Sequence, residues 1–551
     1  MKFNKFLLCG AIALSMCACS SDDPGESTKR PAGGDEPDKP ETPVDPDAVV
    51  SPKPAFTLAT QQISVDPSKT YQEMEGFGAS DCWLPNWIGQ YWSSSRLQIA
   101  NWLFSQKISG GKPQGIGLSM WRVNLGAGTA DAPGGGGIDS DNANNRAEAF
   151  LATGGNYDWT KCAGQRWFME QAKNNGVESF VLFSNSPLVQ YTKNGQGRSD
   201  SKGQSNLKDD CYDDYAAYMA EVAAHFSEEG YKITHISPVN EPQYDWDGTA
   251  QEGSGWQNTQ VAQLARELDK ALDSQGLNTL ISLGETADWT ATYSGEKGRK
   301  NTIDAFFNPA SEAYVGDLKH IARHIGGHSY WTFDNWNEMR NVRRNVKTAA
   351  DARGIAVWQT EWSMLDKEPS ELGGTYDQVS EFDIAQYMSR IIHNDITMAG
   401  CTSWSYWTAM SVERWSQKNR FELIKTTPSG GNYSNDFTSG GSIEATPNLW
   451  VLGNYSLFVR PGYKRCDLTL KESKDFFGTA YVAPDGSRLV LVITNYDKQR
   501  GVNLDMPLPS GAKAVYTYTT TADKTLRQER FNTADKVFVD PASVTTVVYE
   551  F

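Results

Sequence analysis

The stretch 233–242, which reads ITHISPVNEP, decides the fold. Its first residues form a strand-like run, and Pro238 stops this run because proline has no N–H group for a sheet ladder. Asn240 and Glu241 follow directly. In (β/α)8 barrels the reacting groups lie at the C-terminal ends of the strands, where the loops converge over a packed base. A polar pair at this position is therefore a candidate site.

Seven further runs of strand length alternate with amphipathic helical stretches, which is the pattern of repeated βα units. The eight predicted strands are 75–78, 117–124, 179–183, 233–238, 280–284, 320–328, 355–359 and 402–406. A typical helical stretch is 214–226, whose apolar residues recur at helical spacing. Eight units predict an α/β fold, a (β/α)8 TIM barrel over residues 71–454.

The sequence pattern changes near residue 454, where helical periodicity gives way to short alternating runs separated by turns. This pattern is typical of an antiparallel β-sandwich. We expect a side domain formed by residues 455–551, joined by residues 55–70, which precede the barrel and have strand character.

The N-terminus predicts export. Two lysines and a short apolar run make residues 1–18 a signal peptide, too short to span a bilayer. The stretch ending at Cys19 resembles a bacterial lipobox, so Cys19 is the expected site of lipidation; an ordinary cleaved signal is the alternative. Residues 19–54 are rich in Pro, Asp, Glu, Gly and Ser, which predicts a disordered acidic linker. We expect an outer-membrane or cell-surface lipoprotein, with a periplasmic location as the alternative.

Composition limits the partners. A formal charge of -16 disfavours nucleic acid and anionic lipid surfaces, so the only expected membrane contact is the lipid anchor. Aromatic residues make up 11% of the chain, which slightly favours sugar binding. The cysteines after the signal are scattered, without the spacing of a zinc site or a disulfide framework, and are expected to be buried free thiols. No cofactor or metal is implied, and the oligomeric state stays open.

A second glutamate occupies an equivalent position. The stretch 355–362, IAVWQTEW, is an apolar run that ends directly in Glu361. By the strand count, Glu241 and Glu361 follow strands 4 and 7, which lie across the barrel mouth, so both carboxylates can face one sugar. Glycosidic cleavage needs two such groups, and their separation decides between retention and inversion. The sequence leaves that separation open.

Four motifs together resemble glycoside hydrolase family 30: Asn240-Glu241-Pro242, Gln359-Thr360-Glu361-Trp362, Gly76-Phe77-Gly78, and the stretch 454–463, NYSLFVRPGY. The resemblance spans residue 55 to the C-terminus. It implies a barrel with a side β-sandwich and a retaining mechanism. It also implies that Glu241 is the general acid/base and Glu361 the nucleophile.

The resemblance extends to supporting residues. Arg122 matches an arginine that keeps the nucleophile charged, Asn240 matches a residue that binds the sugar 2-hydroxyl, and Tyr330 matches a tyrosine that orients the nucleophile. Three further candidates for substrate binding are His328, beside Tyr330, and two tryptophans after strand 8 that could stack on the sugar, Trp404 and Trp407.

Glu285 ends the fifth predicted strand and lies at the mouth as well. We interpret it as a substrate-binding or structural carboxylate, because the family keeps neither catalytic glutamate on that strand.

The stretches 237–253 and 183–195 look like those of the endo-β-1,6-galactanase subgroup, which makes Asn185 a further substrate-binding candidate. The stretch 187–189, Pro-Leu-Val, departs from this pattern, because related members are expected to carry aromatic residues there; endo or exo action therefore stays open. A β-1,6-glucanase and a xylanase-like member are the close alternatives.

The sequence speaks against two other classes of protein. A non-catalytic glycan-binding lipoprotein would have lost a carboxylate, yet both are present. A protease or esterase would carry a Gly-x-Ser-x-Gly or His-Glu-x-x-His motif, and the sequence has neither.

Overall fold

A closed barrel of eight parallel strands forms the centre of the molecule, in a computed structural model that describes residues 49–551 except 297, 415–416 and 508. The strands follow one another around the barrel in sequence order. They are β3 (Gly76–Ser80), β6 (Met120–Asn124), β7 (Ser179–Phe183), β8 (Ile233–Ser237), β9 (Leu280–Thr286), β10 (Ile321–His328), β11 (Ala356–Glu361) and β12 (Cys401–Tyr406). The predicted signal peptide 1–18 and Cys19 lie outside the described residues.

All eight predicted barrel strands are present, and the predicted TIM barrel is confirmed. Every residue of β3, β6 and β12 is buried. Parallel barrel strands are covered on both faces, so they are largely apolar runs, which explains why the sequence pattern located them.

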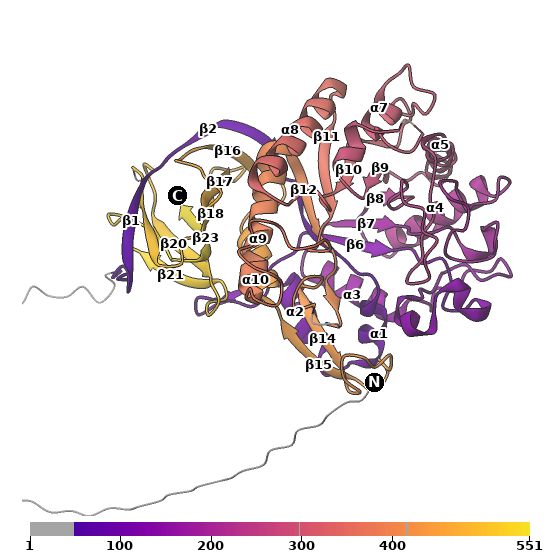
Figure 1. Cartoon of the computed structure of the whole chain (residues 1–551), viewed down its shortest axis with the longest axis horizontal. Coiled ribbons are helices and arrows are strands. Elements are labelled where there is room, and N and C mark those ends of the chain that lie inside the picture. The colour runs from indigo at the N-terminus through magenta and orange to yellow at the C-terminus, as the bar shows by residue number, and fades with distance from the viewer. Residues whose placement is uncertain (1–48, 297, 415–416, 508) are drawn as a thin grey trace, which may run out of the picture. The chain divides into compact units, whose positions relative to one another are not determined.

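Helices in the connections surround the barrel (Figure 1). They are α1 (Leu84–Tyr91), α2 (Arg96–Phe104), α3 (Ala163–Asn174), α4 (Tyr212–Glu228), α5 (Asn258–Ser274), α6 (Thr290–Tyr293), α7 (Thr302–Phe307), α8 (Trp336–Arg353), α9 (Glu381–Asn394) and α10 (Pro447–Ser456). The predicted helix 214–226 lies within α4. Side chains cap the start of α8 and of α9: Asn335 accepts the N–H of Glu338, and Ser380 and Asp383 form a capping box.

The predicted side domain consists of two packed sheets. The larger, antiparallel sheet has the order β2-β16-β17-β18-β23-β20-β21, and the smaller has the order β1-β19-β22. Their strands are β1 (Thr57–Gln62), β2 (Ser64–Glu73), β16 (Lys464–Thr469), β17 (Phe476–Val482), β18 (Arg488–Asn495), β19 (Arg500–Asp505), β20 (Ala514–Thr520), β21 (Arg527–Phe531), β22 (Phe538–Val539) and β23 (Ser543–Glu550). Short strands outside both domains are β4 (Ile108–Ser109), β5 (Lys112–Pro113), β13 (Met410–Ser411), β14 (Ile424–Pro428) and β15 (Gly441–Ala445).

The larger sheet is apolar on both faces because one face packs on the smaller sheet and the other on the helices of the barrel domain. Leu489 and Leu491 of β18 join the core shared with the smaller sheet. The alternate residues Val490 and Val492 join the main core around the barrel helices, since successive strand residues point to opposite faces. In Figure 1, α9 and α10 lie between the barrel and this sheet, and Gln386 of α9 donates to the carbonyl oxygen of Asn495 at 2.9 Å.

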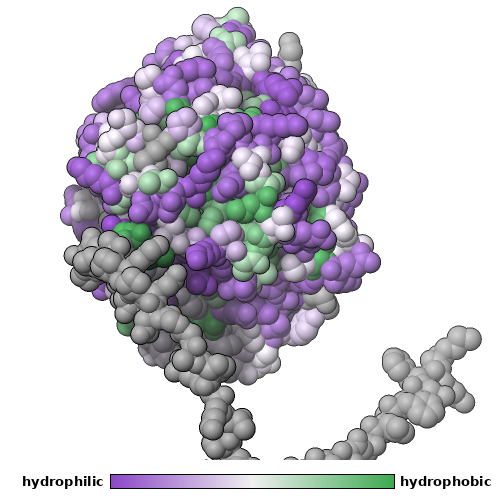
Figure 2. Space-filling model, turned by 90° about the vertical axis from the view of Figure 1, so that its left-hand side faces the viewer, coloured by the Kyte–Doolittle hydropathy of each residue, from purple (hydrophilic) through white to green (hydrophobic). Residues whose placement is uncertain are grey.

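The surface on the β-sandwich side is mostly hydrophilic, with a hydrophobic area near its middle (Figure 2). Among the described residues, no helix has both the length and the apolar character needed to cross a membrane. The cysteines of the described part are buried and free, as expected; they are Cys82, Cys162, Cys211, Cys401 and Cys466.

Candidate active site

Five charged or titratable side chains meet at the C-terminal end of the barrel. Arg122 comes from β6, Glu285 from β9, His328 from β10 and Glu361 from β11, while Glu241 follows β8. All five are buried. The structure therefore brings together five residues, each of which the sequence indicated as a site candidate.

Glu361 is surrounded by hydrogen-bond donors. Nη1 of Arg122 donates to its Oε2 at 2.8 Å, and the Tyr330 hydroxyl donates to its Oε1 at 3.0 Å. The Arg122 guanidinium also lies over the ring of Phe183, 3.9 Å from the ring centre. These contacts stabilise a negative charge on Glu361 and hold the carboxylate in one orientation.

Glu285 accepts hydrogen bonds from three residues of the site. Its Oε2 accepts from Nη2 of Arg122 at 3.1 Å, from Nε2 of His328 at 3.2 Å and from the Thr360 hydroxyl at 2.7 Å. Burial opposes ionisation, but the charge of Arg122 and the hydrogen bond from His328 outweigh it, and the pKa of Glu285 is lowered. Glu285 therefore carries a buried negative charge.

The backbone brings Glu285 to this position through Gly284. Gly284 has φ +110°, and a Cβ atom there would lie 2.4 Å from the carbonyl oxygen of Gly326 on β10. Only glycine fits such a close approach. Glu285 itself has φ 46°, in a region that non-glycine residues seldom occupy and that is enriched at functional sites.

The surroundings of Glu241 shift its pKa in the opposite direction from that of Glu285. Nδ1 of His328 lies 2.9 Å from its Oε1, and its backbone also has a positive φ, 43°. Burial is the main cause that raises the pKa of Glu241, and the negative charge of Glu361 adds to the rise, while His328 opposes it. Glu241 is thus biased toward holding a proton.

His328 is the second cation of the site. Burial lowers its pKa, but the charge of Glu361 and the hydrogen bonds to Glu241 and Glu285 outweigh burial and raise the pKa to about 10. Both ring nitrogens then donate, Nδ1 to Glu241 and Nε2 to Glu285.

The same geometry defines a possible metal cluster. Ligand atoms of Glu241, His328 and Glu361 all lie within 4.8 Å of one another. A histidine must be neutral to bind a metal. The raised pKa of His328 favours its charged form instead. The set is therefore better suited to proton transfer than to binding a cation.

Three asparagines, Asn124, Asn185 and Asn240, lie at the ends of or after β6, β7 and β8. Oδ1 of Asn240 lies 3.5 Å from Nη2 of Arg122. Asn185 donates from Nδ2 to Oδ1 of Asn124 at 3.2 Å, and its own Oδ1 is buried without a hydrogen-bond partner. Such an unpaired acceptor is costly unless a ligand or water supplies the donor, which fits a sugar hydroxyl.

The two predicted tryptophans have different surroundings. Trp407 is partly exposed and packs edge-on against Trp83, with ring centres 5.5 Å apart. Trp404 is fully buried, and its indole N–H donates to Asp395 at 2.9 Å. A sugar in the mouth cannot stack on Trp404 without displacing its neighbours, so only Trp407 offers a ring surface.

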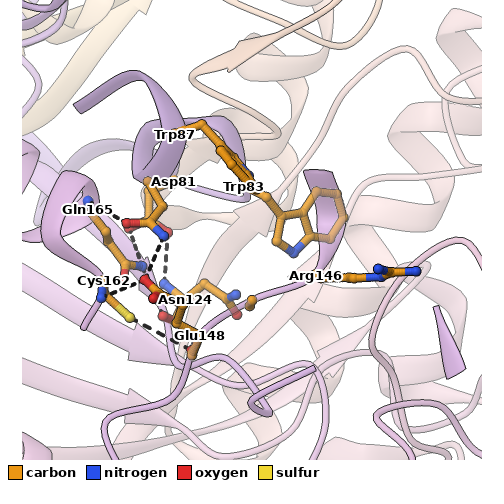
Figure 3. Close-up of a pocket in the computed structure, with 10 residues that line it drawn as sticks. Asp81, Trp83, Trp87, Asn124, Arg146, Glu148, Cys162 and Gln165 are labelled. Carbon is orange, nitrogen blue, oxygen red and sulfur yellow. Dashed lines mark hydrogen bonds between the residues drawn. The ribbon is translucent and has the colours of Figure 1, made fainter. Parts of the chain in front are cut away.

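A pocket opens beside this network, at the ends of β3 and β6 (Figure 3). Asp81 accepts from the backbone N–H of Asn124 at 2.8 Å and from Gln165 at 2.7 Å. Burial raises the pKa of Asp81 to about 7. Trp83 and Trp87 also line this pocket, so its lining combines aromatic and polar side chains.

Several of these residues were absent from the sequence prediction. Asn124 follows Arg122 by two residues on β6, and period-two alternation already places both on one strand face. Thr360 directly precedes Glu361 in the motif Gln359-Thr360-Glu361-Trp362. Asp81 and Trp83 carry no local signal of this kind, because their role depends on neighbours from distant segments.

Comparison with known proteins agrees with this site. Residues 60–419 match the profile of O-glycosyl hydrolase family 30. The endo-β-1,6-galactanase of Hypocrea rufa is 24% identical over 83% of this chain and 87% of its own length. A conserved exported protein from Bacteroides fragilis has 30% identity and a TM-score of 0.81, with 88% of this chain and 100% of that chain covered.

More distant structures share the fold. The catalytic domain of the family 30 xylanase C from Talaromyces cellulolyticus has 20% identity and a TM-score of 0.61, with 89% of this chain and 100% of that chain covered. The family match covers well over half of the chain and includes both glutamates. The protein is therefore a glycoside hydrolase that belongs to O-glycosyl hydrolase family 30.

Proposed function

We propose that this hydrolase cleaves β-1,6-linked galactan, as found in arabinogalactan side chains, with retention of anomeric configuration. The observation that carries the mechanism is the pair Glu241 and Glu361, whose carboxylate oxygens approach within 4.8 Å in contrasting environments. Retaining enzymes keep their two carboxyl groups about 5–5.5 Å apart, whereas inverting enzymes leave room for a water molecule between them.

In the first step Glu361 attacks the anomeric carbon and the glycosidic C–O bond breaks. Glu241 gives its proton to the leaving oxygen, so the sugar becomes an ester of Glu361. Arg122 and Tyr330, which contact Glu361, hold the attacking carboxylate in place. Asn240 lies beside Arg122 and is positioned to bind a hydroxyl of the same sugar.

In the second step water attacks the anomeric carbon and gives a proton to Glu241, while the bond between that carbon and Glu361 breaks and Glu361 leaves as a carboxylate. The change of role follows from the electrostatics. The charge of Glu361 is one cause that raises the pKa of Glu241, and that charge disappears in the ester. The pKa of Glu241 then falls, which suits a general base.

The substrate proposal rests on the similarity to the Hypocrea rufa endo-β-1,6-galactanase and on the stretches 183–195 and 237–253. Purified protein is to be assayed on β-1,6-galactan, β-1,6-glucan and xylan, with Glu241→Gln and Glu361→Gln as matched variants. The proposal is supported if the wild type cleaves galactan and each substitution lowers that activity at least about 100-fold. Activity on glucan or xylan alone contradicts the substrate, and unchanged turnover in both variants contradicts the mechanism.

We also propose export and anchoring through a lipid on Cys19, from the signal-like residues 1–18. Cells expressing the full chain are labelled with a fatty acid and fractionated. The anchor is supported if labelled protein is found in the membrane fraction and Cys19→Ser abolishes the label. Unlabelled protein in the soluble fraction contradicts it.

A further inference from the structure

Two aromatic side chains at the barrel mouth are unusually exposed. Tyr244, in the loop after β8, is 53% exposed, and Trp331, in the loop after β10, is 44% exposed. Each follows a residue of the active site closely: Tyr244 comes three residues after Glu241, and Trp331 comes directly after Tyr330. Other rings are also exposed, among them Tyr71 on β2, so the position of Tyr244 and Trp331 beside the catalytic candidates, and not their exposure alone, makes them candidates for substrate contact.

Hydrogen bonds fix the turn that carries Tyr244. The carbonyl oxygen of Glu241 accepts from the backbone N–H of Tyr244 at 2.9 Å and from the indole N–H of Trp246 at 3.2 Å. Arg299 donates to the carbonyl oxygen of Tyr244 at 2.9 Å and forms an ion pair with Asp245 at 2.8 Å. The Tyr244 ring is thus presented from a rigid turn that begins at Glu241.

Trp331 is held at an energetic cost. Its φ is 53°, a conformation that bulky side chains rarely adopt. Its ring centre lies 5.7 Å from that of Tyr330, whose hydroxyl contacts Glu361. Backbone strain combined with exposure of a large ring is typical of a binding residue.

The position of Glu241 tells which part of the substrate these rings face. A general acid protonates the leaving oxygen, so the leaving sugar lies on its side of the scissile bond. Tyr244 and Trp331 belong to the loops of β8 and β10, on the arc that runs through β9. Trp83 and Trp407 belong to the loops of β3 and β12, neighbouring strands on the opposite arc.

We propose that Trp331, with Tyr244, forms a stacking platform for the leaving-group part of the glycan. This inference rests on the proposed function. Aromatic rings on both sides of the scissile bond bind sugar units on both sides. Such a platform strengthens binding of a polymeric substrate relative to a substrate with a small leaving group.

The test separates the leaving group from the rest of the substrate. Kinetics of the full chain are measured on β-1,6-galactan and on β-1,6-galactobiosyl fluoride, whose leaving fluoride cannot occupy a sugar site. We expect Trp331→Ala to lower the ratio of kcat/KM on galactan to kcat/KM on the fluoride about 10-fold. Alanine keeps a Cβ atom, so the substitution does not introduce the backbone freedom that glycine would. Trp331→Phe should restore most of the ratio.

The controls distinguish the possible failures. Tyr71→Ala removes a ring that is 41% exposed on β2, outside the barrel, and should leave the ratio unchanged. Tyr244→Ala should lower the ratio in the same direction as Trp331→Ala. A ratio that neither Trp331→Ala nor Tyr244→Ala changes overturns the platform. If the wild type cleaves neither galactan substrate, the substrate proposal fails, and the same ratio measured on the glycan that it cleaves decides the platform.

Discussion

Nδ1 of His328 lies 2.9 Å from Oε1 of Glu241, and Nε2 of the same ring lies 3.2 Å from Oε2 of Glu285. One imidazolium therefore joins the proposed acid/base to a third glutamate that takes no direct part in the chemistry. The ring opposes the rise in the pKa of Glu241 that burial causes. The third glutamate in turn helps to keep the ring charged.

Substituting Glu285 should change the pH dependence of stability. His328 has a pKa of about 10 in the folded chain and an ordinary value near 6.5 when unfolded. The stabilisation that charged His328 gives the folded chain is fully present below pH 6.5 and is lost as the pH rises to about 10. In Glu285→Gln the pKa of His328 falls, so the free energy of unfolding should decline less between these values. One proton accounts for at most about 1.4 kcal/mol per pH unit.

Urea unfolding across this pH range measures the effect. Glu267→Gln, which removes a carboxylate from an exposed pair with Lys270, is the matched control and should follow the wild type. Parallel curves for Glu285→Gln and the wild type would show that Glu285 does not maintain the charge of His328.

Azide should separate the roles of the two catalytic candidates. In Glu361→Ala the nucleophile is missing, so azide attacks the sugar directly and gives a product of inverted configuration. In Glu241→Ala the ester still forms from a substrate with a good leaving group, and azide then gives a product of retained configuration. NMR of the glycosyl azides assigns each configuration; the reverse assignment would exchange the two roles.

Removing the Tyr330 hydroxyl should lower kcat. Tyr330→Phe keeps the ring but loses the 3.0 Å hydrogen bond to Glu361. A hydrogen bond to a charged group contributes about 1.5–3 kcal/mol, which predicts a loss of about 10- to 100-fold. Tyr387→Phe, whose hydroxyl bonds to the carbonyl oxygen of Phe333, is the control in the same barrel. Equal activities of both variants would mean that Tyr330 does not orient Glu361.

His235 should make the fold sensitive to acid. Burial inside the barrel lowers its pKa to about 3, against 6.5 for an ordinary histidine. As the pH falls below 6.5, His235 binds a proton in the unfolded chain but stays neutral in the folded chain. The free energy of unfolding therefore declines until about pH 3. His235→Phe keeps a ring against Trp358, which lies 4.5 Å away, and should decline less steeply. Unfolding curves between pH 6.5 and 4 that run in parallel would contradict this.

The sequence predicted the barrel well for a physical reason. Strands covered on both faces must be apolar along their length, and such runs are visible locally, as in β7 and β12. The short strands β13 and β15 carry no such signal and were not predicted.

Individual site residues show the limit of this reasoning. Trp404 and Trp407 are three residues apart at one strand end, and the sequence alone made both of them ring surfaces for a sugar. The structure shows Trp404 fully buried, with Asp395 as the partner of its indole N–H. That partner comes from the preceding helical segment, so its contact could not be deduced from β12.

The sequence by itself determined the fold class and the two carboxylates, because strand order follows from a repeated pattern and each glutamate directly ends an apolar run. The tertiary structure decided the rest of the site. Arg122, Glu285 and His328 meet from three separate strands, and their charges depend on distances of about 3 Å across the barrel. No local pattern encodes those distances, since they arise only when the barrel closes.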